Sequence, residues 1–146
     1  MYRTTKNTAL HMVIHSSMVE IVDYILTREP KLINIADMDG NLPIHNISST
    51  ILLERLINAG KAELNVRNNI GASPLYILFE NEIDDSVDMV NAMVIHCSAL
   101  VDKRDYEGNG PLHYAALRFI QRLADIEHLR VLVNHGIYIN SRNIYG

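Results

Sequence analysis

Apolar residues recur with the period of an amphipathic helix in four separate segments of the chain. Within each segment they follow the i, i+3, i+4 and i+7 spacing that puts them on one face of an α-helix. The segments cover residues 19–26, 51–57, 87–95 and 126–133. The pattern therefore predicts four helices, each with one buried face.

A second set of helices is predicted upstream of these segments. Each follows a short shared pattern, with an aliphatic residue and then His or Tyr at its end, found at residues 8–11, 42–45, 73–76 and 110–113. Three of the four copies contain proline, which loses no hydrogen bond in the first turn of a helix, and Thr8 or Ser73 can cap the free amides. We therefore expect a helix to start at each of these positions.

A third pattern, [N/D]-x-x-[N/D]-x-x-G, occurs four times, with its glycine at positions 40, 71, 108 and 146. Asn and Asp side chains bond to nearby backbone amides, and Gly adopts backbone angles that a Cβ would forbid. Each copy is therefore predicted to form a tight turn. The chain then reads as repeated units of turn, helix, loop and helix, which is typical of a repeat protein.

These units resemble ankyrin repeats, in which about 33 residues pair a β-turn with two antiparallel helices and carry a T-P-L-H-x-A signature. Residues 110–116 and 20–22 match best, and Gly60 and Gly136 resemble the glycine that ends the outer helix. The resemblance implies an all-α, ankyrin-repeat solenoid of stacked helix-turn-helix units with short β-turn fingers. It implies a single domain over residues 1–146, with approximate repeats at 4–36, 37–67, 68–104 and 105–142, and with 143–146 starting a further repeat.

The units depart from an ideal repeat in several places. Lys6 stands where the first unit would have its turn glycine, so that hairpin is expected to be incomplete. The extra length of the third and fourth units falls at 81–86 and 117–125, where we expect loops on one face. Such degenerate spacing, with many Ile and Asn residues, is similar to ankyrin proteins of large DNA viruses, poxviruses in particular. Because the last unit stops on its turn, we interpret the chain as a fragment of a longer array or a truncated gene product.

Composition limits the classes of function. With 48% hydrophobic and 21% charged residues, the chain is typical of an ordered, folded protein. Its net charge of −4 argues against a nucleic-acid binder, which usually has an excess of Lys and Arg. Cys97 is the only cysteine, so no disulfide can form within the chain, and the pattern contains no signal peptide or membrane span. We expect a soluble protein without nucleic-acid or membrane partners, in the cytoplasm (the host cytoplasm if viral) or the nucleus.

Residues that suggest catalysis have structural explanations. His96 and Cys97 are adjacent, and neighbours on a helix point about 100° apart, so they do not form a catalytic pair. The acidic stretch 80–88 lacks the glycine and the ligand spacing of a calcium loop. We therefore predict no catalytic residue and no cofactor, and hence no enzyme.

Histidines suggest a metal site in one place. His11 and His15 have the i, i+4 spacing with which one helical turn can hold a metal. However, His11, His45 and His113 occupy the signature position, where the resemblance implies a structural hydrogen bond that links turns. We therefore predict no metal site.

The variable positions of the turns are free to contact a partner. The resemblance implies that targets are held by the hairpin tips and by the concave face of the inner helices. Carried over by position, the tip residues are Met38, Asp39, Asn69, Ile70, Tyr106 and Glu107, with Ile144 and Tyr145 if the last turn is ordered. The groove would be faced by the residues directly after the signature, Met12, Asn46, Ile77 and Tyr114. Exposed Met, Ile and Tyr on polar turns are typical of contact residues.

Arginine recurs at one position of three turns, as Arg67, Arg104 and Arg142. Stacked repeats would bring the three into a row along one edge. In one interpretation they are solvated and pair locally with Asp105 or Glu107, which contributes well under ~1 kcal/mol each. In the other, they form a strip that docks an acidic segment of a partner.

These patterns favour a non-enzymatic protein–protein interaction module, monomeric or part of a longer array. A viral origin would make its partner a host protein. The alternative is a structural fragment of a longer ankyrin scaffold, or a truncated viral gene product, with no binding activity of its own.

Overall fold

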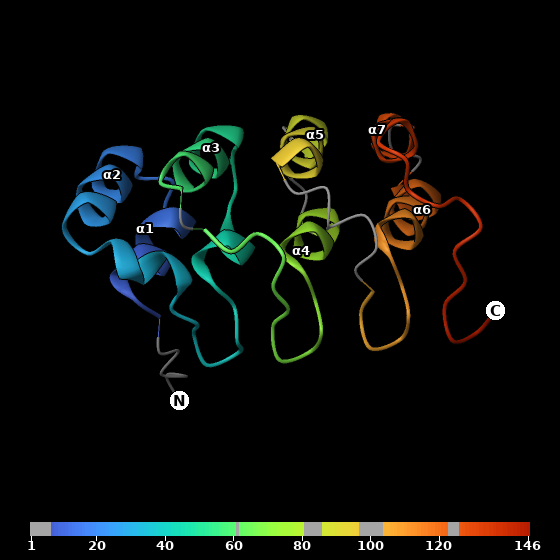
Figure 1. Ribbon diagram of the computed structural model, residues 1–146, viewed down its shortest axis with the longest axis horizontal. Helices are drawn as coiled ribbons and strands as arrows, with labels where there is room; N and C mark the ends of the chain where they lie inside the picture. The colour runs from blue at the N-terminus through green and yellow to red at the C-terminus, as the bar shows by residue number, and fades with distance from the viewer. Residues whose placement is uncertain (1–6, 61, 81–85, 97–103, 123–125) are drawn as a thin grey trace.

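The computed structural model describes residues 7–60, 62–80, 86–96, 104–122 and 126–146 (Figure 1). Its elements in chain order are α1 (Ala9–His15), α2 (Val19–Arg28), the 3-10 helices η1 (Pro30–Asn34) and η2 (Pro43–Asn46), α3 (Thr50–Asn58), α4 (Pro74–Glu80), α5 (Ser86–His96), α6 (Pro111–Arg122) and α7 (Glu127–Asn134). These ranges contain no strand. The predicted all-α architecture is confirmed.

The helices form two layers, and each repeat contributes one helix to each layer (Figure 1). The outer layer contains α2, α3, α5 and α7, and the inner layer contains α1, η2, α4 and α6. Helices pack against their neighbours along both layers, α3 on α5 and α4 on α6 for example. The turns extend from one edge of the inner layer as a row of fingers (Figure 1). The chain therefore winds as a solenoid of helix pairs.

All four predicted outer helices are confirmed, since α2, α3, α5 and α7 cover the predicted segments to within a residue at their starts. Their predicted glycine ends are confirmed for α3 and α7. Gly60 and Gly136 have φ of +72° and +82°, and each amide donates to a carbonyl three residues back at 2.9 Å. This left-handed ending satisfies the last carbonyls of a helix.

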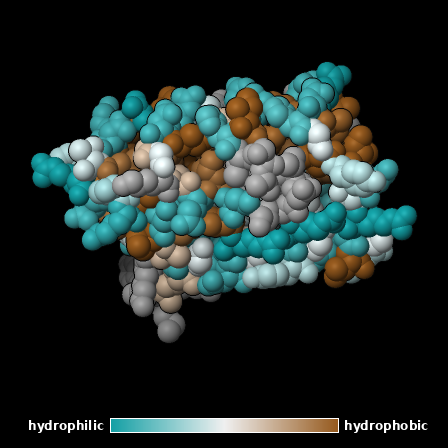
Figure 2. All heavy atoms as spheres, viewed as in Figure 1, coloured by the Kyte–Doolittle hydropathy of each residue, from teal (hydrophilic) through white to brown (hydrophobic). Residues whose placement is uncertain are grey.

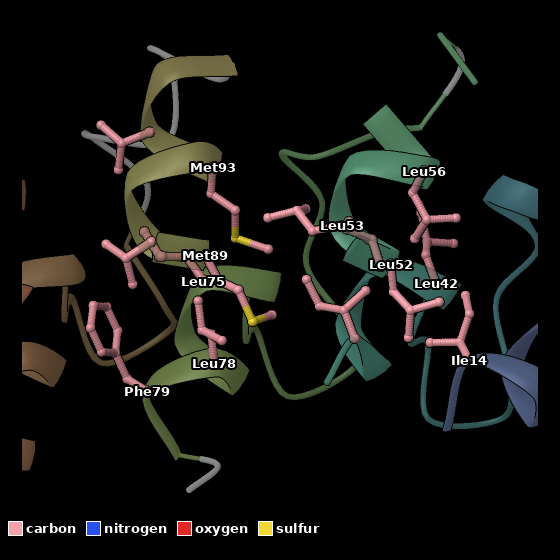
Figure 3. Packing of buried hydrophobic residues seen from close by; sticks show 14 of the residues in the cluster. Ile14, Leu42, Leu52, Leu53, Leu56, Leu75, Leu78, Phe79, Met89 and Met93 are labelled. Atoms are coloured by element: carbon pink, nitrogen blue, oxygen red, sulfur yellow. The ribbon is translucent and has the colours of Figure 1, made fainter. Parts of the chain in front are cut away.

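One apolar core runs between the two layers and continues from repeat to repeat (Figure 3). Helix α3 contributes three fully buried leucines: Leu53 points toward Met93 of the next repeat, whereas Leu52 and Leu56 lie on the side of Ile14 in the preceding repeat. Full burial of one such side chain contributes about 1.5–3 kcal/mol. The stacking of repeats therefore contributes to the stability of the fold, and it determines where the fingers stand.

The inner element of the second repeat is shorter than the predicted helix. Residues 43–46 make only the single turn of η2, whereas the other three predicted starts lead to the α-helices α1, α4 and α6. The next helix begins soon afterwards, because the Ser49 hydroxyl accepts from the amide of Leu52 at 3.4 Å and caps α3. Between them the buried Ile47 has extended backbone angles. The turn glycines Gly40 and Gly71 are 31 residues apart, against 37 for Gly71 and Gly108, so this repeat has no room for a second helical turn before the cap of α3.

The expectation of a loop at 117–125 is wrong for its first part. Helix α6 continues to Arg122, with 12 residues against 7 in α4, so the extra length extends the inner helix. The stretch 117–122 contains no Gly or Pro and is rich in residues that lose little side-chain freedom in a helix. Residues 81–85 and 123–125, together with Lys6 and Cys97, lie outside the described residues.

Candidate protein-binding surface

Four turns project from the inner layer (Figure 1). They are called finger 1 (37–40), finger 2 (68–71), finger 3 (105–108) and finger 4 (143–146). Each forms around the side chain of its first residue: in finger 1, Asp37 Oδ1 accepts from the amides of Asp39 at 2.9 Å and Asn41 at 2.8 Å. Asn68 in finger 2 and Asp105 in finger 3 each accept from two amides in the same way, and Asn143 in finger 4 accepts from the amide of Tyr145. The predicted turns are confirmed, and side-chain-to-backbone bonds fix their shape.

The glycine that closes a finger is required for two reasons. Gly40 and Gly71 have φ of +77° and +82°, a conformation that other residues rarely adopt. A Cβ on Gly40 would lie 2.5 Å from the Asn69 side chain, and a Cβ on Gly71 would lie 2.7 Å from the ring of Tyr106. Because Gly40 and Gly71 have no Cβ, the next finger can pack closely against each of them.

Hydrogen bonds tie finger 2 to finger 1. The Asn69 amide donates to Asp39 O at 3.0 Å, and its side chain donates to Met38 O at 3.0 Å. Asn68 Nδ2 donates to Asn41 Oδ1 at 2.8 Å. The predicted contact residue Asn69 thus has a structural role, because it is the link between two fingers.

The signature histidines form hydrogen bonds with the backbone next to the fingers. His11 Nε2 lies 2.9 Å from Asn41 O, at the base of finger 1, and His11 Nδ1 lies 2.9 Å from the Thr8 hydroxyl. His45 and His113 each accept, through Nδ1, from an amide three residues upstream. The predicted link between turns is therefore present at His11. Burial lowers the pKa of His45 below its ordinary value, although hydrogen bonds with the backbone of Leu42 and Ala72 oppose the shift.

All of the predicted tip residues are exposed. Met38, Ile70 and Tyr106 expose 54%, 67% and 68% of their surface on three successive fingers. Their acidic neighbours Asp39 and Glu107 are also exposed. Ile144 and Tyr145 add two more exposed apolar side chains on finger 4. The tips therefore present large apolar groups beside carboxylates.

Hydrophilic residues border this row of apolar tips. In the face shown in Figure 2 they form a band along the fingers, and apolar residues appear at its C-terminal end. Scattered apolar anchors within a polar border are common in protein interfaces.

The four predicted groove residues differ in their surroundings. Met12 is exposed, whereas Asn46 and Ile77 are half-buried. Tyr114 is half-buried as well, its ring packs on Tyr76 with centroids 4.1 Å apart, and its hydroxyl donates to Asp105. Only Met12 therefore has most of its side chain open to a partner.

Asp105 and Tyr114 stabilise one another through their hydrogen bond. Burial works against the charged form of Asp105, but hydrogen bonds from Tyr114, Asn109 and Glu107 outweigh it and lower the pKa of the carboxyl. Burial, and then the bond to Asp105, raise the pKa of Tyr114 far above its ordinary value. The pair consists of a carboxylate and a neutral phenol, so it is a structural link and not an acid–base pair poised near neutral pH.

The arginine row contains residues in different environments. Arg104 is half-buried, and its Nη1 donates to Gly108 O at 3.0 Å and to Arg142 O at 2.6 Å. Arg104 pairs with neither Asp105 nor Glu107 in the described part of the chain, so the interpretation with local ion pairs is wrong for this residue. Arg67 and Arg142 are exposed.

Sequence reasoning missed the contact between Tyr76 and Tyr114. One signal was available, because Tyr76 replaces the signature histidine in the third repeat, and a tyrosine at that position makes different contacts from a histidine. It also missed the exposed apolar residues of the outer helices, such as Tyr24, Ile51 and Ile95.

No group of three or more His, Cys, Asp and Glu side chains among the described residues could hold a metal ion. In the same ranges, no helix has the length and apolar character needed to cross a membrane.

Comparison with known proteins agrees with this architecture. The family model described as ankyrin repeat matches residues 107–144, which comprise the second half of finger 3, helices α6 and α7 and the first half of finger 4. A curated protein from Caenorhabditis elegans, described as an intracellular phospholipase A2, is 27% identical over 130 residues, which are 86% of this chain. The chain spans only 12% of the length of that relative.

The match, the stacked helix pairs and the glycine-closed fingers define an ankyrin-repeat fold. Together they support an ankyrin-repeat protein, a class whose repeats generally mediate protein–protein interaction.

Proposed function

We propose that this chain is a non-enzymatic protein-binding module that holds a protein partner through its finger tips and the concave face of its inner helices. One observation carries the proposal: Met38, Ile70 and Tyr106 are large apolar side chains exposed on three successive fingers. Fingers 1 and 2 are locked together by hydrogen bonds, so their backbone has little freedom to lose on binding. A preorganised apolar surface of this kind favours binding over any role in folding.

The chemistry of the tips indicates what the partner offers. Met and Tyr are enriched at protein interfaces, and a few such anchors usually carry most of the binding energy. Asp39 and Glu107 stand next to the apolar tips, where they would form a polar rim. The partner would therefore present an apolar patch bordered by hydrogen-bond donors or basic groups, and an acidic segment opposite the arginines.

Two further points belong to this proposal. A viral origin, which the degenerate spacing of the repeats favours, would make the partner a host protein and the location the host cytoplasm. The nematode relative is described as an intracellular phospholipase A2, but this chain aligns with only 12% of it. We propose no phospholipase activity for this chain.

Affinity capture from cytosolic extract with matched variants tests the proposal. The tip variant carries Met38→Ser, Ile70→Ser and Tyr106→Ser. Its control carries Tyr24→Ser, Ile51→Ser and Ile95→Ser, which remove three apolar side chains of similar exposure, 56% to 61%, from the outer helices. Truncating an anchor costs about 1 kcal/mol or more, so the tip variant should bind its partner roughly a hundredfold more weakly. The control should bind like the original chain.

Thermal unfolding of both variants verifies that each is folded. Loss of the partner in the control, with binding kept in the tip variant, would contradict the proposal and move the site to the outer helices. A folded chain that captures no protein would favour a second function, a structural unit within a longer array. The alignment of the chain with a small part of a longer protein is the observation that favours this second function.

A further inference from the structure

The C-terminal face of the last repeat differs from the same face of the first repeat. There, His11 accepts from the amide of Thr8 through Nδ1, so its neutral ring carries the proton on Nε2, which lies 2.9 Å from Asn41 O. Asn41 belongs to the next repeat and directly follows the glycine of finger 1. In the last repeat, His113 accepts from the amide of Gly110 in the same way, at 3.1 Å. The Nε2 proton of His113 has no acceptor among the described residues.

A second link between repeats is also open at this face. The side chain of Asn34, the first residue of the turn pattern that ends in finger 1, accepts from the amide of Glu63 in the next repeat at 3.0 Å. Asn140 has the same position before finger 4, where it is exposed and makes no hydrogen bond within the described ranges. The last repeat therefore presents one donor and one acceptor at the positions where the first repeat bonds to its neighbour.

Apolar positions show the same difference in exposure. Ile33, directly before the asparagine of the first repeat, exposes 2% of its surface, whereas Ile139, directly before that of the last, exposes 68%. Leu112 in the signature of the last repeat is only half-buried. The same signature position is fully buried in the other three repeats, as Leu10, Ile44 and Leu75. A further repeat would bury both Leu112 and Ile139.

A hollow of about 170 Å³ lies beside these residues. Its lining comes from the start of α6, the loop before finger 4 and Arg104, and it includes His113, Leu112 and Tyr138. The hollow has room for several water-sized groups. The backbone of an approaching turn therefore has space next to His113.

We propose that this face is a stacking interface for one further ankyrin-type repeat, which continues the array after finger 4. The repeat would supply a backbone carbonyl to His113 Nε2 and an amide to Asn140. Its apolar side chains would cover Leu112 and Ile139. In the first repeat the acceptor of the histidine directly follows the finger glycine, so a residue directly after Gly146 would reach His113. This surface is separate from the finger tips and goes beyond the function proposed above.

The first repeat of a second copy fits this face less well. Lys6 stands where that repeat would need its finger glycine. The glycines of fingers 1, 2 and 3 have φ between +77° and +82°, which a lysine rarely adopts. The nematode relative shows that a sequence of this kind can form a small part, 12%, of a longer polypeptide. Both points favour a repeat on the same polypeptide.

An extended chain tests the inference. Residues 109–146 are repeated directly after Gly146, so the added unit begins at the same point of the pattern as the unit after Gly108. We expect the melting temperature to rise by about 5 °C or more, since each stacked interface adds to the stability of a repeat array. In NMR spectra the Nε2 proton of His113 should exchange slowly in the extended chain only. A chain extended by the same residues in scrambled order should melt like the original.

Ile139→Ser separates stacking from a general effect of added length. It should lower the melting temperature by less than about 2 °C in the original chain and by about 5 °C or more in the extended chain, where the side chain would be buried. Ile51→Ser removes another exposed isoleucine, from the outer helix α3. It should have the same small effect in both chains.

Each of the following results overturns the inference. Equal effects of Ile139→Ser in the two chains, or fast exchange of the His113 proton in the extended chain, would show that no repeat stacks there. In sedimentation experiments we expect the original chain to be a monomer, and self-association that Ile139→Ser abolishes would assign the face to a second copy. A stop codon directly after the codon for Gly146 in the transcript would exclude a continuation of the array.

Discussion

At the scale of single residues, the hydrogen-bond partners of one side chain decide what it does in this molecule. Asn69 and Arg104 occupy variable turn positions, and the sequence predicts both as contact residues. In the structure Asn69 links two fingers, and Arg104 donates to the carbonyl of Gly108 in finger 3 and to that of Arg142, directly before finger 4. The sequence places these residues at the turns, but two of their acceptors, Met38 O for Asn69 and Arg142 O for Arg104, lie 31 and 38 residues away along the chain. Periodicity alone could not identify those acceptors.

The buried His45 predicts a dependence of stability on pH. Burial favours its neutral form, so the unfolded chain binds a proton there at a higher pH than the folded chain does. The free energy of unfolding should therefore fall as the pH drops below 6.5, the ordinary pKa of histidine, until the pH reaches the lower pKa of the folded state. Urea unfolding between pH 7.5 and pH 5, values on the order of the ordinary histidine pKa, measures this slope.

Two variants isolate the contribution of His45. In His45→Gln the slope should become smaller, even if the variant is less stable at every pH. Exposed His15→Gln should keep the slope of the original chain. An identical slope in His45→Gln would contradict the assignment.

At the scale of elements, the fingers and the outer helices follow local rules and the inner helices do not. A turn residue, a glycine and an apolar stripe are enough to locate each finger and each of α2, α3, α5 and α7. The inner elements depend on unit length: η2 is cut short by the cap of α3 at Ser49, and α6 extends through residues expected in a loop. Competition between neighbouring elements decides these lengths. The sequence of one segment alone therefore does not predict where its helix ends.

The tight approach of fingers 2 and 3 predicts the effect of filling Gly71. In Gly71→Ala the new methyl group would combine a positive φ with a position 2.7 Å from the Tyr106 ring. We expect the free energy of unfolding to fall by about 2–3 kcal/mol, since an alanine in this conformation alone costs about 1–2 kcal/mol. Urea denaturation of the purified variant measures the loss.

Gly60→Ala is the matched control for this variant. Its φ is +72°, but a Cβ there would meet only the Asn58 carbonyl, 4.0 Å away. It should lose about 1 kcal/mol, from the backbone conformation alone. Equal losses in the two variants would mean that the ring of Tyr106 is not seated on Gly71.

At the scale of the whole molecule, stacking converts four similar units into one surface with distinct regions. The apolar core between the layers holds the inner helices in register, and the register sets the fingers in a row (Figures 1 and 3). The order of the repeats, the finger tips and the exposed Met38, Ile70 and Tyr106 were predictable, because each follows from one repeating pattern. The contact between the Tyr76 and Tyr114 rings was not, since it joins side chains of two different repeats.

Site-specific photo-crosslinking in cytosolic extract tests most directly the claim that the finger tips hold a protein partner. A p-benzoylphenylalanine replaces Ile70 at a finger tip in one variant and Ile51 on the outer helix α3 in another, two isoleucines that are both exposed. The account predicts one discrete protein adduct from position 70 and none from position 51. An adduct from position 51 alone, or the same adduct from both positions, would contradict a binding surface at the finger tips.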